Sequence, residues 1–230
     1  MLRHAIAAVL LCTSGALSGA QRAIGVGSFD RVRVDGGFDV RITTGRSPRA
    51  TLSGDQQALD RVDLRVDGTT LTLRRRSDDA RTARLAMSPV IVTLSAQTLS
   101  AATMLGGGRI SIDRVRGDRV DLAVAGTGAI AVAGMDARLA NASVVGGGAM
   151  TLAGSADRVR LTTNGAGSID AADLVADDLV VRLDGLGEIR ANARHLASVS
   201  TTGLGRVAVT GNAKCTVRAP DGGAVTCGAP

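Results

Sequence analysis

Apolar and polar residues alternate along most of this chain, in short runs separated by turn residues. Val62, Leu64 and Val66, for example, alternate with charged residues, which is the pattern of a half-buried β-strand. No run has the length of a stable amphipathic helix. A single helical turn is expected at residues 56–60, with Asp55 as its N-cap. The pattern therefore predicts an all-β protein.

Two β-hairpins are expected in the N-terminal part of the chain. Alternating runs at residues 29–34 and 38–42 flank an Asp-Gly-Gly turn at residues 35–37. A second pair of alternating runs flanks Asp67-Gly68. Turns of this composition between alternating runs are typical of hairpins, because glycine and aspartate tolerate the backbone angles of tight turns.

The second half of the chain contains an internal repeat. A Gly-x-Gly pair recurs six times, and the distances between successive first glycines are 20, 20, 19, 20 and 18 residues. An apolar residue follows each second glycine after two positions. Such constant register indicates a repeat architecture. The pairs are Gly106/Gly108, Gly126/Gly128, Gly146/Gly148, Gly165/Gly167, Gly185/Gly187 and Gly203/Gly205.

These repeats predict a β-solenoid with coils of about twenty residues. One coil of this size cannot bury its apolar face alone, so neighbouring coils must stack. The glycines fit corners where φ is positive or where adjacent backbones approach closely. Stacked coils would place one apolar side chain per coil in a single inward ladder. Its expected members are Ile110, Ile130, Met150, Ile169, Ile189 and Val207.

The two ends of a solenoid need caps, because an open sheet edge invites aggregation. The N-terminal hairpins are predicted to cover one end. Cys215 and Cys227 lie close together in the sequence, near the other end. In an exported protein such a pair indicates a disulfide, here one that ties a C-terminal cap. No histidine or third cysteine lies nearby in the sequence, so a metal site is not expected.

The first 20 residues are predicted to be a signal peptide. Residues 5–12 are apolar but too short to span a membrane, and the small Ser18 and Ala20 suit cleavage after Ala20. Lipidation at Cys12 is disfavoured because Leu11 is not small. The mature chain contains no further candidate span, and we expect it in the periplasm or at the cell surface. The predicted division is a signal peptide (1–20), an N-terminal strand region continuous with the solenoid (21–105), and the repeat solenoid with its cap (106–230).

The amino-acid composition indicates which residue types fill the core and which charge the surface carries. Aromatic residues make up 1% of the chain, namely Phe29 and Phe38, so the core must be mainly aliphatic. The formal net charge is +6, which permits attraction to anionic polymers. The basic and polar stretch 74–84 is expected to be a solvated loop. Nucleic-acid binding is not expected, because stacking aromatic residues are lacking.

The order of these motifs resembles a known family. The segments Phe-Asp-Arg-Val-Arg-Val (29–34), Gly-Phe-Asp-Val-Arg-Ile (37–42) and Asp-Gly-Thr-Thr-Leu-Thr-Leu (67–73) precede the recurring Gly-x-Gly-x-Ile units. In this order, the stretch from Phe29 to Val217 resembles the domain of unknown function 2807, also named the putative auto-transporter adhesin head, or GIN, domain. The resemblance implies a right-handed β-helix in exported bacterial envelope proteins. It supplies no catalytic residues.

Catalytic, cofactor and metal sites are not predicted. Each Gly-x-Gly leads into a strand and not a helix, which argues against a phosphate-binding loop. His195 is expected to be a surface or turn residue. One acidic stretch could bring carboxylates together on adjacent coils, as polysaccharide-acting β-helix enzymes require, although solvated turn caps are the simpler interpretation. Its members are Asp170, Asp173, Asp177, Asp178, Asp184 and Glu188.

Three functions are compatible with these features. The leading hypothesis is a non-enzymatic envelope protein that presents a rigid solenoid for binding or adhesion. Its partners would be envelope polymers, cell-surface components or further copies of itself. A structural, self-associating periplasmic module is the second hypothesis, and a carbohydrate-active enzyme is the third. The sequence does not name the ligand, and it separates neither the periplasm from the cell surface nor a monomer from an oligomer.

Overall fold

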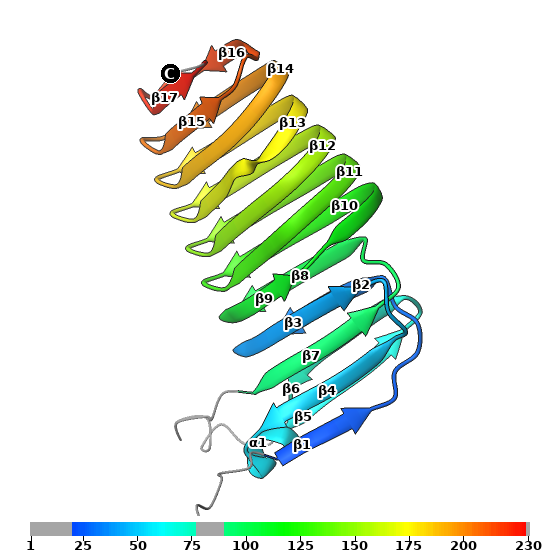
Figure 1. The fold of residues 1–230 in the computed structure, drawn as a ribbon. Helices are drawn as coiled ribbons and strands as arrows, with labels where there is room; N and C mark the ends of the chain where they lie inside the picture. The colour runs from blue at the N-terminus through cyan, green and yellow to red at the C-terminus, as the bar shows by residue number, and fades with distance from the viewer. Residues whose placement is uncertain (1–19, 77–89, 229–230) are drawn as a thin grey trace, which may run out of the picture.

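The computed structural model describes residues 20–76 and 90–228. These residues form a 17-stranded sheet wound into a β-solenoid of about 6 turns, with one short helix near its N-terminal end (Figure 1). The predicted all-β solenoid is therefore confirmed. The predicted signal peptide lies outside the described residues except for Ala20, which begins the first strand.

The strands fall into an irregular N-terminal group and a regular C-terminal group. The first group is β1 (Ala20–Ile24), β2 (Arg31–Asp35), β3 (Phe38–Thr44), β4 (Arg49–Gly54), α1 (Gln56–Asp60), β5 (Val62–Asp67), β6 (Thr70–Arg75) and β7 (Ile91–Ala96). The second group is β8 (Ala101–Gly106), β9 (Gly108–Ile112), β10 (Val115–Gly126), β11 (Ala129–Gly146), β12 (Ala149–Gly165), β13 (Ser168–Gly185), β14 (Glu188–Thr202), β15 (Arg206–Thr210), β16 (Lys214–Arg218) and β17 (Ala224–Cys227).

Each regular coil has two long sides that meet at a Gly-x-Gly corner. In one coil, residues 120–126 of β10 run into the corner, and residues 129–132 of β11 leave it. A short third side follows at residues 135–137. All three sides pair in parallel with the neighbouring coil, with register shifts between the second and third sides. The long strands β10 to β14 therefore bend around the coil while they keep their pairing (Figure 1).

The predicted inward ladder is confirmed. Each member pairs directly with its counterpart in the next coil, and all six side chains are at most 1% exposed. Burial of one such side chain contributes about 1.5–3 kcal/mol before the entropy of ordering is subtracted. The ladder consists of Ile110, Ile130, Met150, Ile169, Ile189 and Val207.

The hairpin predicted at residues 35–37 is wrong. Strand β2 pairs in parallel with β6 and β8, and β3 pairs in parallel with β7 and β9. The two strands are consecutive sides of one coil, and the N–H of Gly36 at its corner donates to the carbonyl oxygen of Leu105 at 3.0 Å. A glycine with positive φ serves a solenoid corner as well as a hairpin turn, so long-range pairing decided between them. This coil lies between β6–β7 and β8–β9, although β4 to β7 follow it in the sequence (Figure 1).

Two other local predictions are confirmed. Strands β5 and β6 pair antiparallel around Asp67-Gly68, as expected of a hairpin. Asp55 caps α1, because its side chain accepts hydrogen bonds from the N–H groups of Gln57 and Ala58. In both cases a short polar side chain or a glycine satisfies the turn locally, without help from distant residues.

The predicted basic loop begins later than expected, because Arg74 and Arg75 belong to β6. Arg74 donates to the buried Asp63 through its Nε at 2.8 Å. Arg75 lies over the ring of Phe38, 5.1 Å from its centroid, where a guanidinium interacts favourably with the aromatic face. The rest of the predicted loop lies mainly outside the described residues.

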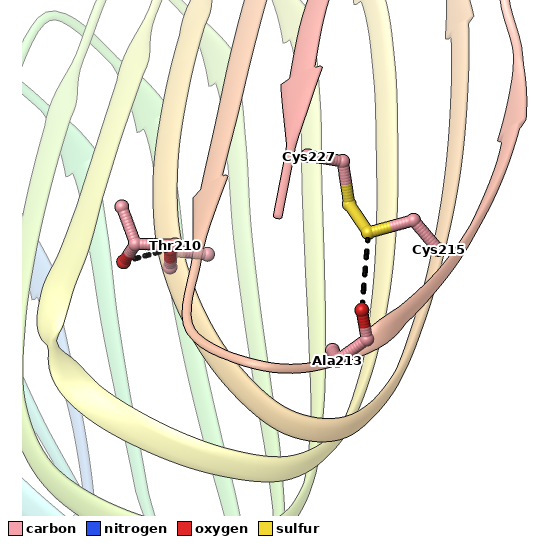
Figure 2. Close-up of a disulfide and its surroundings, with 5 residues drawn as sticks. Thr210, Ala213, Cys215 and Cys227 are labelled. Atoms are coloured by element: carbon pink, nitrogen blue, oxygen red, sulfur yellow. Dashed lines mark hydrogen bonds between the residues drawn. A yellow bond between two sulfur atoms is a disulfide. The ribbon is translucent and has the colours of Figure 1, made fainter. Parts of the chain in front are cut away.

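The two ends of the solenoid are built differently. At the N-terminal end, β1 and β5 pair antiparallel with β4 and β6, in contrast to the parallel coils. At the C-terminal end, β16 pairs only with β14 and β17 only with β15. The predicted disulfide between Cys215 and Cys227 is present and joins these two edge strands, as Figure 2 shows.

Candidate binding surface

At most of the paired glycine positions, the corners leave no room for a side chain. The first glycine of each pair has a positive φ, from 83° at Gly106 to 118° at Gly126. A Cβ atom on Gly126 would lie 2.7 Å from the carbonyl oxygen of Gly106, and one on Gly128 would lie 2.6 Å from Cγ of Met104. The N–H groups of Thr127 and Gly128 already donate to that Gly106 oxygen. The corner N–H groups are therefore engaged within the solenoid, unlike those of a phosphate-binding loop.

The second glycine of each pair is required for a different reason from the first. Positive φ, one of the two reasons expected for these glycines, is found at Gly108 alone among the six second positions. The other five have no positive φ, so the alternative reason must account for them. These five are Gly128, Gly148, Gly167, Gly187 and Gly205.

Close approach, the other expected reason, explains these five second glycines. Each would direct a Cβ atom into the previous coil, against a buried side chain and a glycine carbonyl oxygen. On Gly148 and on Gly167 that atom would lie 2.5 Å from Cγ1 of a buried valine, and on Gly187 it would lie 2.9 Å from Cγ2 of Thr163. On Gly205 it would lie 2.6 Å from the carbonyl oxygen of Gly187. Positive φ and backbone stacking thus require the first glycine, whereas close approach to both the backbone and the core of the previous coil requires these five second glycines.

Sequence analysis missed one further corner in the C-terminal cap. A Cβ atom on Gly223 would lie 2.9 Å from the carbonyl oxygen of Gly203, and Val225, two residues later, pairs with Val207. Asp221 stands where the first glycine of the pair would be, and its carboxylate accepts a hydrogen bond from the N–H of Gly203 at 3.3 Å. The glycine-to-apolar spacing was the available signal, but the missing first glycine concealed it.

Charged side chains lie on the outer faces of the coils, where many form ion pairs. Asp121 accepts hydrogen bonds from Nε of Arg119 and from Nδ2 of Asn141 in the next coil, both at 2.8 Å. The hydrogen bond from Arg119 holds the pKa of Asp121 below its usual range; partial desolvation opposes this shift and Asn141 adds to it. Such pairs order the outer face, although exposed ion pairs add little stability individually.

The acidic stretch does not form one carboxylate cluster. Asp170 and Glu188 lie on the second side of the coil, 3.9 and 3.0 Å from the guanidinium of Arg190 that they share. Asp177 lies at the third corner, where the short third side of one coil leads into the first side of the next. Asp184 lies on the first side, which is the long side that runs into the Gly-x-Gly corner. A glycosidase needs two carboxyl groups that flank one bond of the substrate. In the described residues, the neighbouring carboxylates of this stretch are instead bridged by an arginine.

His195 lies on the surface, as expected. Its side chain is 69% exposed, and Nδ1 is 3.9 Å from Oδ1 of Asp177. It shares a shallow hollow at the third corner with Asp118, Arg138 and Asp157 from successive coils. Arg138 and Asp118 pair across coils at 3.5 Å, so the hollow is lined by charges of both signs.

One concave region combines apolar and basic side chains, and we call it the β12–β16 groove. It has a volume of about 390 Å³ and crosses the outer surface of β12, β13, β14 and β16, with Leu139 of β11 at one edge. Volumes of this size suit small ligands. The lining residues are Leu139, Arg158, Val159, Arg160, Asp178, Leu179, Val180, Leu196, Ala197, Ser198, Lys214 and Thr216.

The described part of the chain contains neither a cluster of metal-binding side chains nor a membrane-spanning helix. No group of three or more histidine, cysteine, aspartate or glutamate side chains could hold a metal ion within residues 20–76 and 90–228. Within the same ranges, no helix is long and apolar enough to cross a membrane.

Comparison with protein families agrees with this architecture. The model of the domain of unknown function 2807, described as "Putative auto-transporter adhesin, head GIN domain", matches residues 28–213 and so includes all six Gly-x-Gly corners. The chain belongs to this family. The resemblance inferred from the sequence motifs is thus confirmed, and the match extends from the start of the first coil to just before the disulfide.

Solved structures share the fold of this GIN-domain protein. A putative adhesin from Bacteroides fragilis is 20% identical, with a TM-score of 0.82 and coverage of 94% of this chain and 98% of its own. A putative lipid binding protein from Parabacteroides distasonis is 17% identical, with a TM-score of 0.73 and coverage of 93% and 97%. A putative adhesin from Parabacteroides merdae is also 17% identical, with a TM-score of 0.72 and coverage of 94% and 98%. No curated protein matches the chain.

Proposed function

We propose that this GIN-domain protein is a non-enzymatic, exported envelope protein of bacteria that presents a rigid β-solenoid as a binding or adhesion surface. The observation that carries the proposal is the division between inside and outside. Aliphatic ladders fill the interior, and the charged side chains lie on flat outer faces. A rigid, repetitive outer surface suits the binding of extended partners.

Three features support export. The first 20 residues have the pattern of a signal peptide. The disulfide between Cys215 and Cys227 is of the kind that persists in oxidising compartments. The family and two of the similar structures are named as adhesins. Periplasm and cell surface both satisfy these features.

Two features support a binding role without catalysis. Asp170 and Glu188 of the acidic stretch share the guanidinium of Arg190, so they form an ion-pair network and not a free pair of carboxyl groups that could flank a substrate bond. The net charge of +6 favours anionic partners, and envelope polymers are the abundant anions outside the inner membrane. Phe29 and Phe38, the only aromatic residues, are both buried, so stacking on nucleic-acid bases is not favoured.

The proposal is tested by location and by binding. Protease treatment of intact cells, followed by antibody detection, is expected to remove a surface protein and to spare a periplasmic one until the outer envelope is opened. Purified mature protein is then incubated with isolated envelope polymers and whole cells, beside an unrelated protein of equal net charge. Binding above that control is expected. Binding no stronger than the control would refute the proposal.

Self-association is a second candidate function, favoured by the C-terminal end. All five residues of β16 are exposed, and β16 and β17 each pair on one edge only. Open edges of this kind can pair with another chain. Light scattering across a range of concentrations is expected to show mass growth. A strict monomer at every concentration would exclude this function.

A further inference from the structure

We infer that the β12–β16 groove binds an anionic amphiphile, a molecule with an alkyl chain and a negatively charged head group. The inference rests on the proposed binding function and names a ligand class for it. The groove lies on the first side of the coils, close to the third corner. Of the acidic stretch considered for a carbohydrate-active enzyme, only Asp178 lines the groove.

The strand register explains the shape of the groove. Two rows of outward side chains run across the coils, one through Arg158 and Leu196 and the other through Arg160 and Val180. Between them lies a row whose side chains point inward and are at most 3% exposed, namely Val159, Leu179 and Ala197. The outward rows therefore form two walls over a floor of backbone and buried side chains.

The walls of the groove expose apolar side chains to solvent. Leu196 is 54% exposed, although the residues paired with it on either side are Asp178 and Lys214. Leu139 and Val180 are half-buried along the same groove. Exposed apolar groups gathered in a concave region mark ligand-binding surfaces, because an alkyl chain placed there removes both surfaces from water.

Cations stand beside this apolar strip. Arg158, Arg160 and Lys214 line the groove, and within the described residues none of them has a carboxylate within 4.0 Å. Asp178 is the only acidic lining residue, so three positive and one negative side chains leave an excess of two positive charges. Guanidinium and ammonium groups without ion-pair partners attract an anionic head group and can donate hydrogen bonds to it.

An alkyl anion fits this lining better than an acidic sugar does. Sugar rings stack on aromatic side chains, and neither Phe29 nor Phe38 is exposed or lines the groove. Only Ser198 and Thr216 offer hydroxyl groups there. The groove volume of about 390 Å³ lies at the lower end of the usual range for small-ligand sites.

Calorimetric titration of the purified protein with laurate, below its micelle concentration, tests the inference. Wild-type protein is expected to bind laurate. Leu196→Gln removes apolar wall surface, and the double variant Arg158→Gln/Arg160→Gln removes the cations, so each is expected to weaken binding at least tenfold. Leu204→Gln and Arg182→Gln are the matched controls, because both residues are exposed and neither lines the groove. Both controls are expected to bind like the wild type.

Three ligand comparisons separate head group from tail. Dodecyltrimethylammonium carries the same type of tail with the opposite charge, and acetate carries the head group without a long tail; neither is expected to bind. Binding only to anionic phospholipid vesicles, without binding of monomeric laurate, would overturn the inference that the groove binds an amphiphile. It would indicate attraction to a charged membrane surface instead. Equal laurate affinity of the wild type, L196Q and R158Q/R160Q would also overturn it.

The same variants distinguish this inference from the proposed function. Wild-type protein that binds envelope polymers but not laurate would overturn the amphiphile site alone. Protein that binds laurate through the groove but binds neither polymers nor cells above the control would support the site and refute the adhesion surface.

Discussion

The carbonyl oxygen of Gly165 lies 2.6 Å from the position that a Cβ atom would occupy on Gly185 in the next coil. Gly185 also has a φ of +116°, which residues with side chains rarely adopt. Close stacking and positive φ thus require glycine at the same residue. The corner thus brings the backbones of adjacent coils into direct contact.

Gly185→Ala is expected to destabilise the protein by about 3 kcal/mol, because it adds backbone strain to a steric clash. Urea unfolding followed by circular dichroism measures the change. Gly147→Ala is the matched control, since Gly147 also lies at a corner but a Cβ atom there would have no neighbour within 4 Å, and its φ is not positive. It should change stability by less than about 0.5 kcal/mol. Equal effects of the two substitutions would contradict the role assigned to Gly185.

A buried hydroxyl group interrupts one of the inner ladders. Thr163 is 0% exposed, its Oγ1 has no hydrogen-bond partner among residues 20–76 and 90–228, and it pairs with Val144 and Leu183 in the neighbouring coils. Thr163→Val replaces the hydroxyl with a methyl group, so we expect stabilisation by about 1–2 kcal/mol. Thr162→Val, on the outward face, is the control and should be close to neutral. A loss of stability in T163V would show that the hydroxyl is satisfied in solution.

The disulfide is expected to hold the last coil together. Cys215 and Cys227 are 12 residues apart, and closure of such a loop stabilises by about 3 kcal/mol on the chain-entropy model. Reduction, or the double substitution Cys215→Ser/Cys227→Ser, should therefore increase amide hydrogen exchange in β16 and β17. Exchange in β11 and β12 should change little, because repeat proteins can open locally at their ends. Uniform loss of protection across all coils would contradict a local role.

Stability is expected to fall in acid partly through Asp63. The hydrogen bond from Arg74 holds the pKa of Asp63 below its usual range; partial burial opposes this and Arg65 adds to the lowering. A lowered pKa in the folded state contributes stability above the ordinary carboxyl pKa of 3.8, and that contribution is lost as pH falls through the folded-state pKa. Asp63→Asn should therefore be less stable than the wild type at pH 7, and the difference should shrink below about pH 3.5.

Urea midpoints across this pH range provide the measurement. Asp67→Asn is the control, because Asp67 lies on the same strand without an ion pair among the described residues. A gap between D63N and the wild type that stays constant with pH would show that Asp63 acts through packing and not through its charge.

Turns and helix caps whose hydrogen bonds are formed within a few residues could be predicted from the sequence. Asp55 caps its helix and Asp67-Gly68 turns its hairpin, because each satisfies its backbone partners nearby. The turn at residues 35–37 could not be assigned in this way. A glycine there suits either a hairpin or a coil corner. The hydrogen bond that favours the corner runs from the N–H of Gly36 to the carbonyl oxygen of Leu105, about 70 residues away along the chain.

The sequence by itself determined the solenoid, its coil length, its inward ladder and the disulfide, because a fixed period of glycine and apolar residues repeats wherever a coil repeats. Only the tertiary structure determined the order of the N-terminal coils and which outward side chains become neighbours. It placed the β2–β3 coil between strands that follow it in the sequence, separated the acidic residues onto different sides, and brought Leu196 beside Lys214 in one groove with Arg158. Outward side chains follow no period imposed by burial, so only the stacking register determines which of them become neighbours.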